Sequence, residues 1–115
     1  MLASFAMLMR GRGRKVRDRE HERRMRISQG GRITDGTVLD AQEQPVGDGE
    51  EPIQLLVYSY NVAGVQYECS QDISRLRQFV DLHSCRLGLP ASVKYDAQNP
   101  GNSIVISEDW SGLRK

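Results

Sequence analysis

The 115-residue sequence contains no run of about 18 apolar residues, which excludes a complete membrane-spanning helix within it. It has only two cysteines and no C-x-x-C, and its two histidines, His21 and His83, lie far apart, so neither a disulfide-rich scaffold nor zinc-ligand spacing is present. No G-x-G-x-x-G, Walker loop, G-x-S-x-G or H-E-x-x-H occurs. The sequence therefore predicts no catalytic residue, no metal and no cofactor, and a protein that is not an enzyme.

Charge is present in quantity but is divided unequally along the chain. Residues 1–33 hold ten Arg and Lys against three acids, a net charge of +7, whereas residues 34–115 hold six against twelve, a net charge of −6. This division predicts a basic arm joined to a mildly acidic body. Nearly all arm cations are arginine, whose forked guanidinium suits phosphate groups. The candidate membrane or phosphate contacts are Arg10, Arg12, Arg14, Lys15, Arg17, Arg19, Arg23, Arg24 and Arg26.

The first nine residues, Met1–Met9, are apolar and uncharged, and the basic run follows them. This order differs from a signal peptide, in which the positive charges come first. Nine helical residues rise only about 14 Å, less than half of a bilayer core. Three interpretations stay open: an anchor lying in the membrane interface, the end of a spanning helix whose upstream part is missing, or a disordered or packed apolar tail.

Residues 14–27 contain no Gly or Pro and many helix-forming residues, so they are expected to form a helix. Glu20 and Arg24 are spaced as an i,i+4 ion pair in the favourable order. The few apolar residues, Val16, Met25 and Ile27, make no stripe along one face. The pattern predicts a solvated or frayed helix that takes no part in the core.

The body alternates strand-like runs with turn residues, and its expected strands are 36–43, 53–62, 65–70, 91–96 and 103–107. A helical period over 72–85, with Asp72 as its N-cap, predicts one short helix. Residues 97–102 are expected to form a turn, and the turn at Ala63-Gly64 is expected to exceed two residues because alanine disfavours a positive φ. The predicted fold is mainly β: a small antiparallel five-stranded barrel or sandwich, preceded by the basic helix.

The pattern divides the chain into three parts: residues 1–32 as the apolar N-terminus and basic arm, 33–107 as the β-domain, and 108–115 as a polar tail.

Cys69 and Cys85 are expected to be free thiols, and His83 to be a core residue. The tyrosines are expected to pack on the sheet, with Tyr60 and Tyr67 paired across a hairpin. Trp110 either folds over a barrel end or marks a contact surface. The acidic group at 48–51 is expected to be a solvated loop, because it lacks the spacing of a calcium-binding loop.

Two segments together resemble a known bacterial family. Residues 58–67, Y-S-Y-N-V-A-G-V-Q-Y, are similar to the Y-x-Y-x-V-x-G-x-x-Y hairpin of the family called domain of unknown function 3592. Residues 93–103, V-K-Y-D-A-Q-N-P-G-N-S, are similar to its V-x-Y-D-P-x-N-P-x-x-S turn, except that Ala97 stands where proline is usual. The resemblance spans about residues 33–107. It implies a membrane-tethered β-domain without known activity, and it favours the missing-helix interpretation of Met1–Met9.

These observations predict a non-enzymatic, membrane-associated β-module whose arm contacts an anionic membrane surface and whose body lies on the cytoplasmic side. The alternative is a cytoplasmic nucleic-acid-binding barrel with a basic arm, although the arm lacks the interleaved aromatic residues typical of such proteins. Neither hypothesis includes a small-molecule substrate. The sequence does not identify a protein partner.

Overall fold

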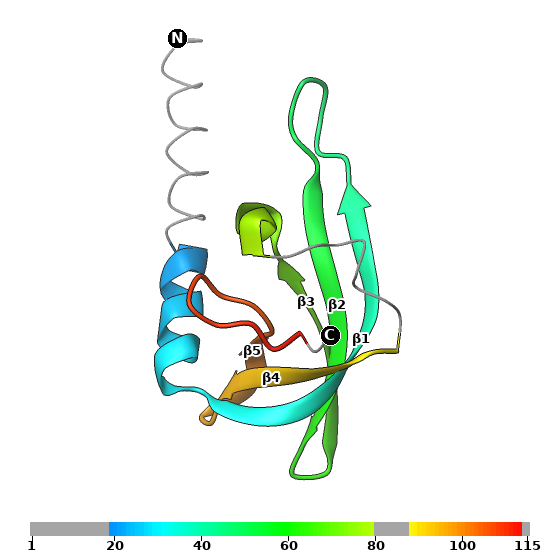
Figure 1. Cartoon of the computed structure of the whole chain (residues 1–115). Coiled ribbons are helices and arrows are strands. Elements are labelled where there is room, and N and C mark those ends of the chain that lie inside the picture. The colour runs from blue at the N-terminus through cyan, green and yellow to red at the C-terminus, as the bar shows by residue number, and fades with distance from the viewer. Residues whose placement is uncertain (1–18, 80–87, 114–115) are drawn as a thin grey trace, which may run out of the picture.

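The computed structural model describes residues 19–79 and 88–113, which form a helix followed by a nearly closed antiparallel barrel (Figure 1). Its five strands are β1 (Arg32–Gln44), β2 (Ile53–Val62), β3 (Val65–Asp72), β4 (Pro90–Asp96) and β5 (Asn99–Ile104). They are ordered β3-β2-β1-β4-β5 in one sheet, and all neighbours are antiparallel. The predicted five-stranded antiparallel barrel preceded by one helix is therefore confirmed.

The long first strand bends so that it pairs with two neighbours. Its first half, residues 32–37, pairs with β4, and residues 36–44 pair with β2, with a bulge between Val38 and Asp40. The bend brings Gly36 close to both partners, because a β-carbon there would lie 2.7 Å from Ser59 O and from a methyl group of Val93. Glycine at this position lets one strand form the corner of the barrel.

The core lies inside the barrel and is made by alternate residues of the strands. Tyr58 and the aliphatic core residues are at most about 1% exposed, as expected from a strand that places every second side chain on one face. The buried cluster consists of Val38, Leu56, Tyr58, Tyr60, Ile73, Leu76, Ala91, Val93, Val105 and Ile106. A sheet rolled in this way brings β3 and β5, the two ends of the strand order, next to each other.

Two predicted turns are shorter in the structure than expected. Val62 pairs with Val65, so Ala63 and Gly64 form a two-residue turn, with φ angles of 52° and 85°. The prediction of a longer turn was wrong because the flanking strands hold Ala63 in the left-handed region despite its side chain. The predicted turn over 97–102 is also wrong in length. Asp96 pairs with Asn99, and β5 begins there, with a register shift that places Pro100–Asn102 in a bulge.

The predicted helix over 72–85 is replaced, in its described part, by a short 3₁₀ helix, η1 (Ser74–Phe79). Asp72 is the last residue of β3, and its Oδ1 accepts hydrogen bonds from the Ser74 amide and hydroxyl, which is the capping role predicted for it. Ile73 and Leu76 are buried as expected. Residues 80–85 of the prediction lie outside the described residues.

The prediction of a solvated basic helix is wrong for the part that the structure describes. Residues 19–30 are helical, and Arg24, Ile27 and Ser28 of this N-terminal helix are buried against the body. The predicted polar tail is also part of the fold: Ser107 N donates to Trp110 O, and residues up to Leu113 form bridges to the barrel. Figure 1 shows this C-terminal turn lying between the helix and the barrel.

Candidate functional site: the helix and the barrel seam

The nine cations predicted to contact phosphate fall into three groups. Arg10, Arg12, Arg14, Lys15 and Arg17 lie outside the described residues. Arg19 and Arg26 are exposed on the N-terminal helix and are free to contact an anionic surface. Arg23 and Arg24 are hydrogen-bonded to the protein itself, which engages most of their donors, and their assignment as membrane or phosphate contacts stays a prediction.

Arg24 is the centre of the contact between the helix and the C-terminal turn. Its side chain is 6% exposed and donates from Nη2 to Glu108 Oε1 at 2.8 Å, and Glu20 lies 3.7 Å away on the same helix. Burial alone would raise the pKa of Glu108, but the hydrogen bond from Arg24, with its charge, outweighs burial and lowers that pKa. The other oxygen, Oε2, is a buried atom without a hydrogen-bond partner among the described residues. The ion pair therefore holds Glu108 ionised in a partly desolvated place.

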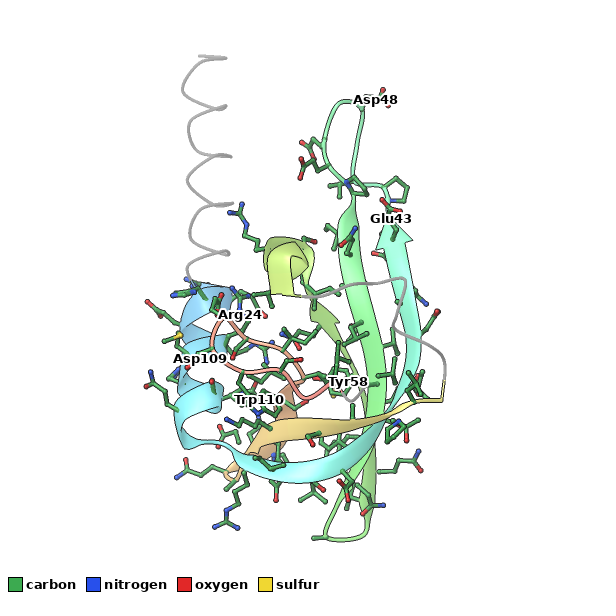
Figure 2. The ribbon with its side chains drawn as sticks, in the orientation of Figure 1. Arg24, Glu43, Asp48, Tyr58, Asp109 and Trp110 are labelled. Atoms are coloured by element: carbon green, nitrogen blue, oxygen red, sulfur yellow. The ribbon has the colours of Figure 1, made fainter. Side chains whose placement is uncertain are left out.

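A second polar contact lies one turn further along the helix. Ser28 donates to Asp109 Oδ1 at 2.7 Å, and Ser107 donates to the same oxygen at 2.8 Å. These hydrogen bonds, first from Ser28 and then from Ser107, lower the pKa of Asp109. Lys94 donates to Ser28 O near the helix C-terminus and lies 4.5 Å from the ring centre of Trp110. Figure 2 shows Arg24, Asp109 and Trp110 gathered where helix, turn and barrel meet.

Arg23 ties the helix to the bulge of β5. Its Nη1 donates to Asn102 Oδ1 at 2.9 Å and to Ser103 O at 2.8 Å, while Nε and Nη2 donate to the two carboxylate oxygens of Glu20. Burial by itself would lower the pKa of Arg23, but the hydrogen bond and the negative charge of Glu20 outweigh burial and raise that pKa. Four of its five N–H donors are thus occupied by the protein.

Side chains close the barrel between β3 and residues 100–106, a boundary we call the seam. Gln71, which is 1% exposed, donates from Nε2 to Ile106 O and accepts from the amides of Val105 and Ile106. One buried amide side chain thereby replaces three strand-to-strand hydrogen bonds. Cys69 adds a weaker contact, with Sγ 3.5 Å from Gly101 O.

Two tyrosines reach the seam from β2. Tyr60 donates to Pro100 O at 2.6 Å, and Tyr58 shares a 2.8 Å hydrogen bond with Ser103 Oγ. Burial raises the pKa of Tyr58 to about 12, partly offset by the bond to Ser103, and burial also raises the pKa of Tyr60. Both phenols therefore keep their protons at neutral pH. Tyr60 also stacks on Tyr67 across the hairpin, with ring centres 5.4 Å apart, which confirms that predicted pair.

The two segments that carry the family resemblance meet at this seam. Tyr58 and Tyr60 belong to the first segment, and their partners Pro100 and Ser103 belong to the second. The residue types of the resemblance therefore have a structural role here, since they close the barrel.

Of the other sequence candidates, Cys69 is a free thiol, while Cys85 and His83 lie outside the described residues. Among the described residues, no three His, Cys, Asp or Glu side chains form a group that could hold a metal.

Sequence reasoning missed Gln71, which closes the seam, and Glu108, which receives the buried Arg24. A lone glutamine inside a strand gives no signal of its own. The helix did offer a signal in its sequence: the polar residues Glu20, Arg24 and Ser28 are spaced four apart and so share one face. A search for apolar residues alone overlooks such a polar face.

No protein-family model, curated protein or solved structure matches this chain. The resemblance to the family called domain of unknown function 3592 therefore stays a prediction. Within residues 19–79 and 88–113, no helix is both long enough and apolar enough to cross a membrane.

Proposed function

We propose that this protein is a non-enzymatic, membrane-associated β-module whose arm binds an anionic membrane surface. The observation that carries the proposal is the division of charge. Residues 10–17 contain five cations and no acid, directly after the apolar Met1–Met9, whereas residues 33–74 contain eight acids and no Lys or Arg. An apolar segment beside a basic one supplies the two signals that stable membrane attachment needs.

The contacts of the helix narrow the set of residues that would bind the membrane. Most donors of Arg23 and Arg24 are engaged in hydrogen bonds within the protein, so these two residues join the helix to the barrel instead. The acceptors are Glu20, Asn102, Ser103 and Glu108. The proposed contacts are therefore residues 1–17 together with the exposed Arg19 and Arg26. The barrel would lie on the cytoplasmic side, where basic residues flanking a membrane segment are concentrated.

The nucleic-acid alternative has less support. Barrels that bind single strands stack bases on exposed aromatic rings. Tyr58 and Tyr60 are instead buried, with exposed fractions of 0% and 3%, and their hydroxyl groups are bonded across the seam.

Flotation with phosphatidylserine-containing vesicles tests the proposal with two variants that lose the same charge. Arg12→Gln/Arg14→Gln removes two cations that precede the helix, and Arg32→Gln/Arg75→Gln removes two exposed cations of the barrel, one at the start of β1 and one on η1. Each cation near an anionic surface contributes about 1 kcal/mol, so the arm variant should bind roughly 30-fold more weakly at low salt.

The body variant should bind like the unmodified chain, and high salt should weaken binding of both. Equal binding by the two variants, or equal binding to uncharged phosphatidylcholine vesicles, would contradict the proposal. Retention of single-stranded nucleic acid that is lost in the arm variant, without vesicle binding, would favour the alternative.

A further inference from the structure

A pocket of about 490 Å³ opens at the seam, with one wall formed by the N-terminal helix. Glu20 and Arg23 line it from the helix, Leu55 and Tyr58 from β2, and Cys69 and Asp72 from β3. This volume lies within the range of small-molecule sites in proteins. The membrane proposal does not use this pocket.

Arg23 is the one cation among the described residues of the lining, and four of its five N–H donors are already bonded within the protein. Its guanidinium forms a two-point ion pair with Glu20 and gives both Nη1 donors to Asn102 and Ser103. An anion entering the pocket would have to compete with the Glu20 carboxylate for the same donors. The opposite charges of Arg23 and Glu20 therefore neutralise each other within the pocket lining.

Asp72 then supplies the uncompensated charge of the lining. Its Oδ1 accepts two hydrogen bonds from Ser74, and its Oδ2 has no partner among the described residues. The other described lining residues on β2, β3 and β5 are uncharged, and Arg75, the nearest cation along the chain, is exposed on η1 and does not line the pocket. The formal charges of Glu20, Arg23 and Asp72 sum to −1, beside the apolar side chain of Leu55.

We propose that the pocket binds a small organic cation, an ammonium or guanidinium group on a short alkyl chain, with the cation at Asp72 and the alkyl part along Leu55. Asp72 attracts the positive charge, and its free oxygen accepts a hydrogen bond from it. The described lining offers polar and apolar surface in similar amounts, so the pocket suits a ligand with one charged end and a short alkyl part.

Three probes with four carbon atoms each separate the effect of charge from that of shape: n-butylamine, 1-butanol and butyrate. Their binding to the full chain is followed by NMR shifts of pocket amides at constant ionic strength. Ligands of this size gain roughly 0.8 kcal/mol per heavy atom, or about 4 kcal/mol for the five heavy atoms of n-butylamine, which corresponds to a Kd of about 1 mM. n-Butylamine, which is an ammonium ion at neutral pH, should bind at least about tenfold more tightly than the other two.

Asp72→Asn should weaken n-butylamine binding at least about fivefold while keeping an oxygen for the Ser74 contact. Glu68→Gln, in the same strand but outside the pocket lining, is the matched control and should bind normally. Tighter binding of butyrate would overturn the proposal in favour of an anion site at Arg23. Equal binding of 1-butanol, or no shift with any probe at 20 times the expected Kd (about 20 mM), would overturn it as well.

Cys69 gives a second measurement because its thiol lines the same pocket. n-Butylamine should slow alkylation of Cys69 by iodoacetamide at least about twofold. Cys85, which trypsin separates from Cys69 by cleavage at Arg75, serves as the reference thiol in the same sample. Slowing of both thiols to the same extent would contradict occupancy of this pocket.

Discussion

Ala63 shows at the scale of one residue how the fold overrides a local preference. It is the only described residue other than glycine with a positive φ, at 52°, and it faces solvent in the β2–β3 turn. The left-handed region costs a residue with a β-carbon about 1 kcal/mol or more, whereas asparagine tolerates it. Ala63→Asn should therefore raise the free energy of unfolding by about 0.5–1 kcal/mol, measured by urea denaturation.

Ala97 provides the control for that prediction, because it is also an exposed alanine in a two-residue turn but does not have a positive φ. Ala97→Asn should change the urea midpoint little. An equal gain in both variants would mean that the effect does not come from the backbone conformation of Ala63.

Gln71 is the second single residue with a large expected effect. Replacement by leucine keeps the volume but leaves two buried amides and one buried carbonyl of residues 105 and 106 without partners. Each unpaired buried group costs about 1–3 kcal/mol, so Gln71→Leu should lose at least about 3 kcal/mol in urea denaturation or fail to fold. Gln66→Leu, at an exposed position of the same strand, should change stability by less than about 0.5 kcal/mol. A loss below about 1 kcal/mol for Gln71→Leu would contradict this role.

At the scale of elements, the N-terminal helix is joined to the barrel mainly by polar contacts. Arg24→Met removes the nearer of the two partners of Glu108 and leaves only the 3.4 Å contact with His21, while one carboxylate oxygen is already unpaired, so the helix should detach more often. We expect a loss of about 2 kcal/mol in protection of the helix amides against hydrogen exchange. Arg26→Met, on the exposed face of the same helix, should leave the exchange unchanged.

The double variant Arg24→Met/Glu108→Leu should recover part of that protection, because replacing both members of an ion pair removes the unpaired charge. No recovery would show that packing of the Arg24 stem, and not its charge, holds the helix.

The elements that could be predicted from the sequence are those in which local preference and tertiary packing agree. The strand Ile53–Val62 was predicted with its observed ends because nearly every residue favours a strand and alternate residues are apolar. The 3₁₀ helix was taken for an α-helix because Ile73 and Leu76, three residues apart, fit either period. The docking of the basic helix could not be predicted from hydropathy, since Arg24 and Ser28 are polar and their partners, Glu108 and Asp109, are more than 80 residues away.

For the whole molecule, the lowered pKa values of Glu108 and Asp109 predict sensitivity to acid. A carboxylate whose folded pKa is lowered contributes stability that is present above the unfolded pKa and is lost as the pH falls through the folded value. The thermal midpoint should therefore decrease as the pH is lowered from the ordinary pKa range of glutamate and aspartate to the lower pKa values of these two groups in the folded protein. Glu108→Gln should lower the midpoint at neutral pH and flatten its decline in acid. An unchanged slope would contradict the contribution of Glu108.

The contact between Arg24 and Glu108 also has a consequence for the order of events during synthesis. Arg24 leaves the ribosome 84 residues before its partner, and the seam that receives Arg23 is likewise completed only when residues 99–106 have emerged. The N-terminal helix is thus synthesised well before its docking surface exists. Under the proposed function, the basic arm of the nascent chain would therefore be able to engage a lipid surface before the barrel forms.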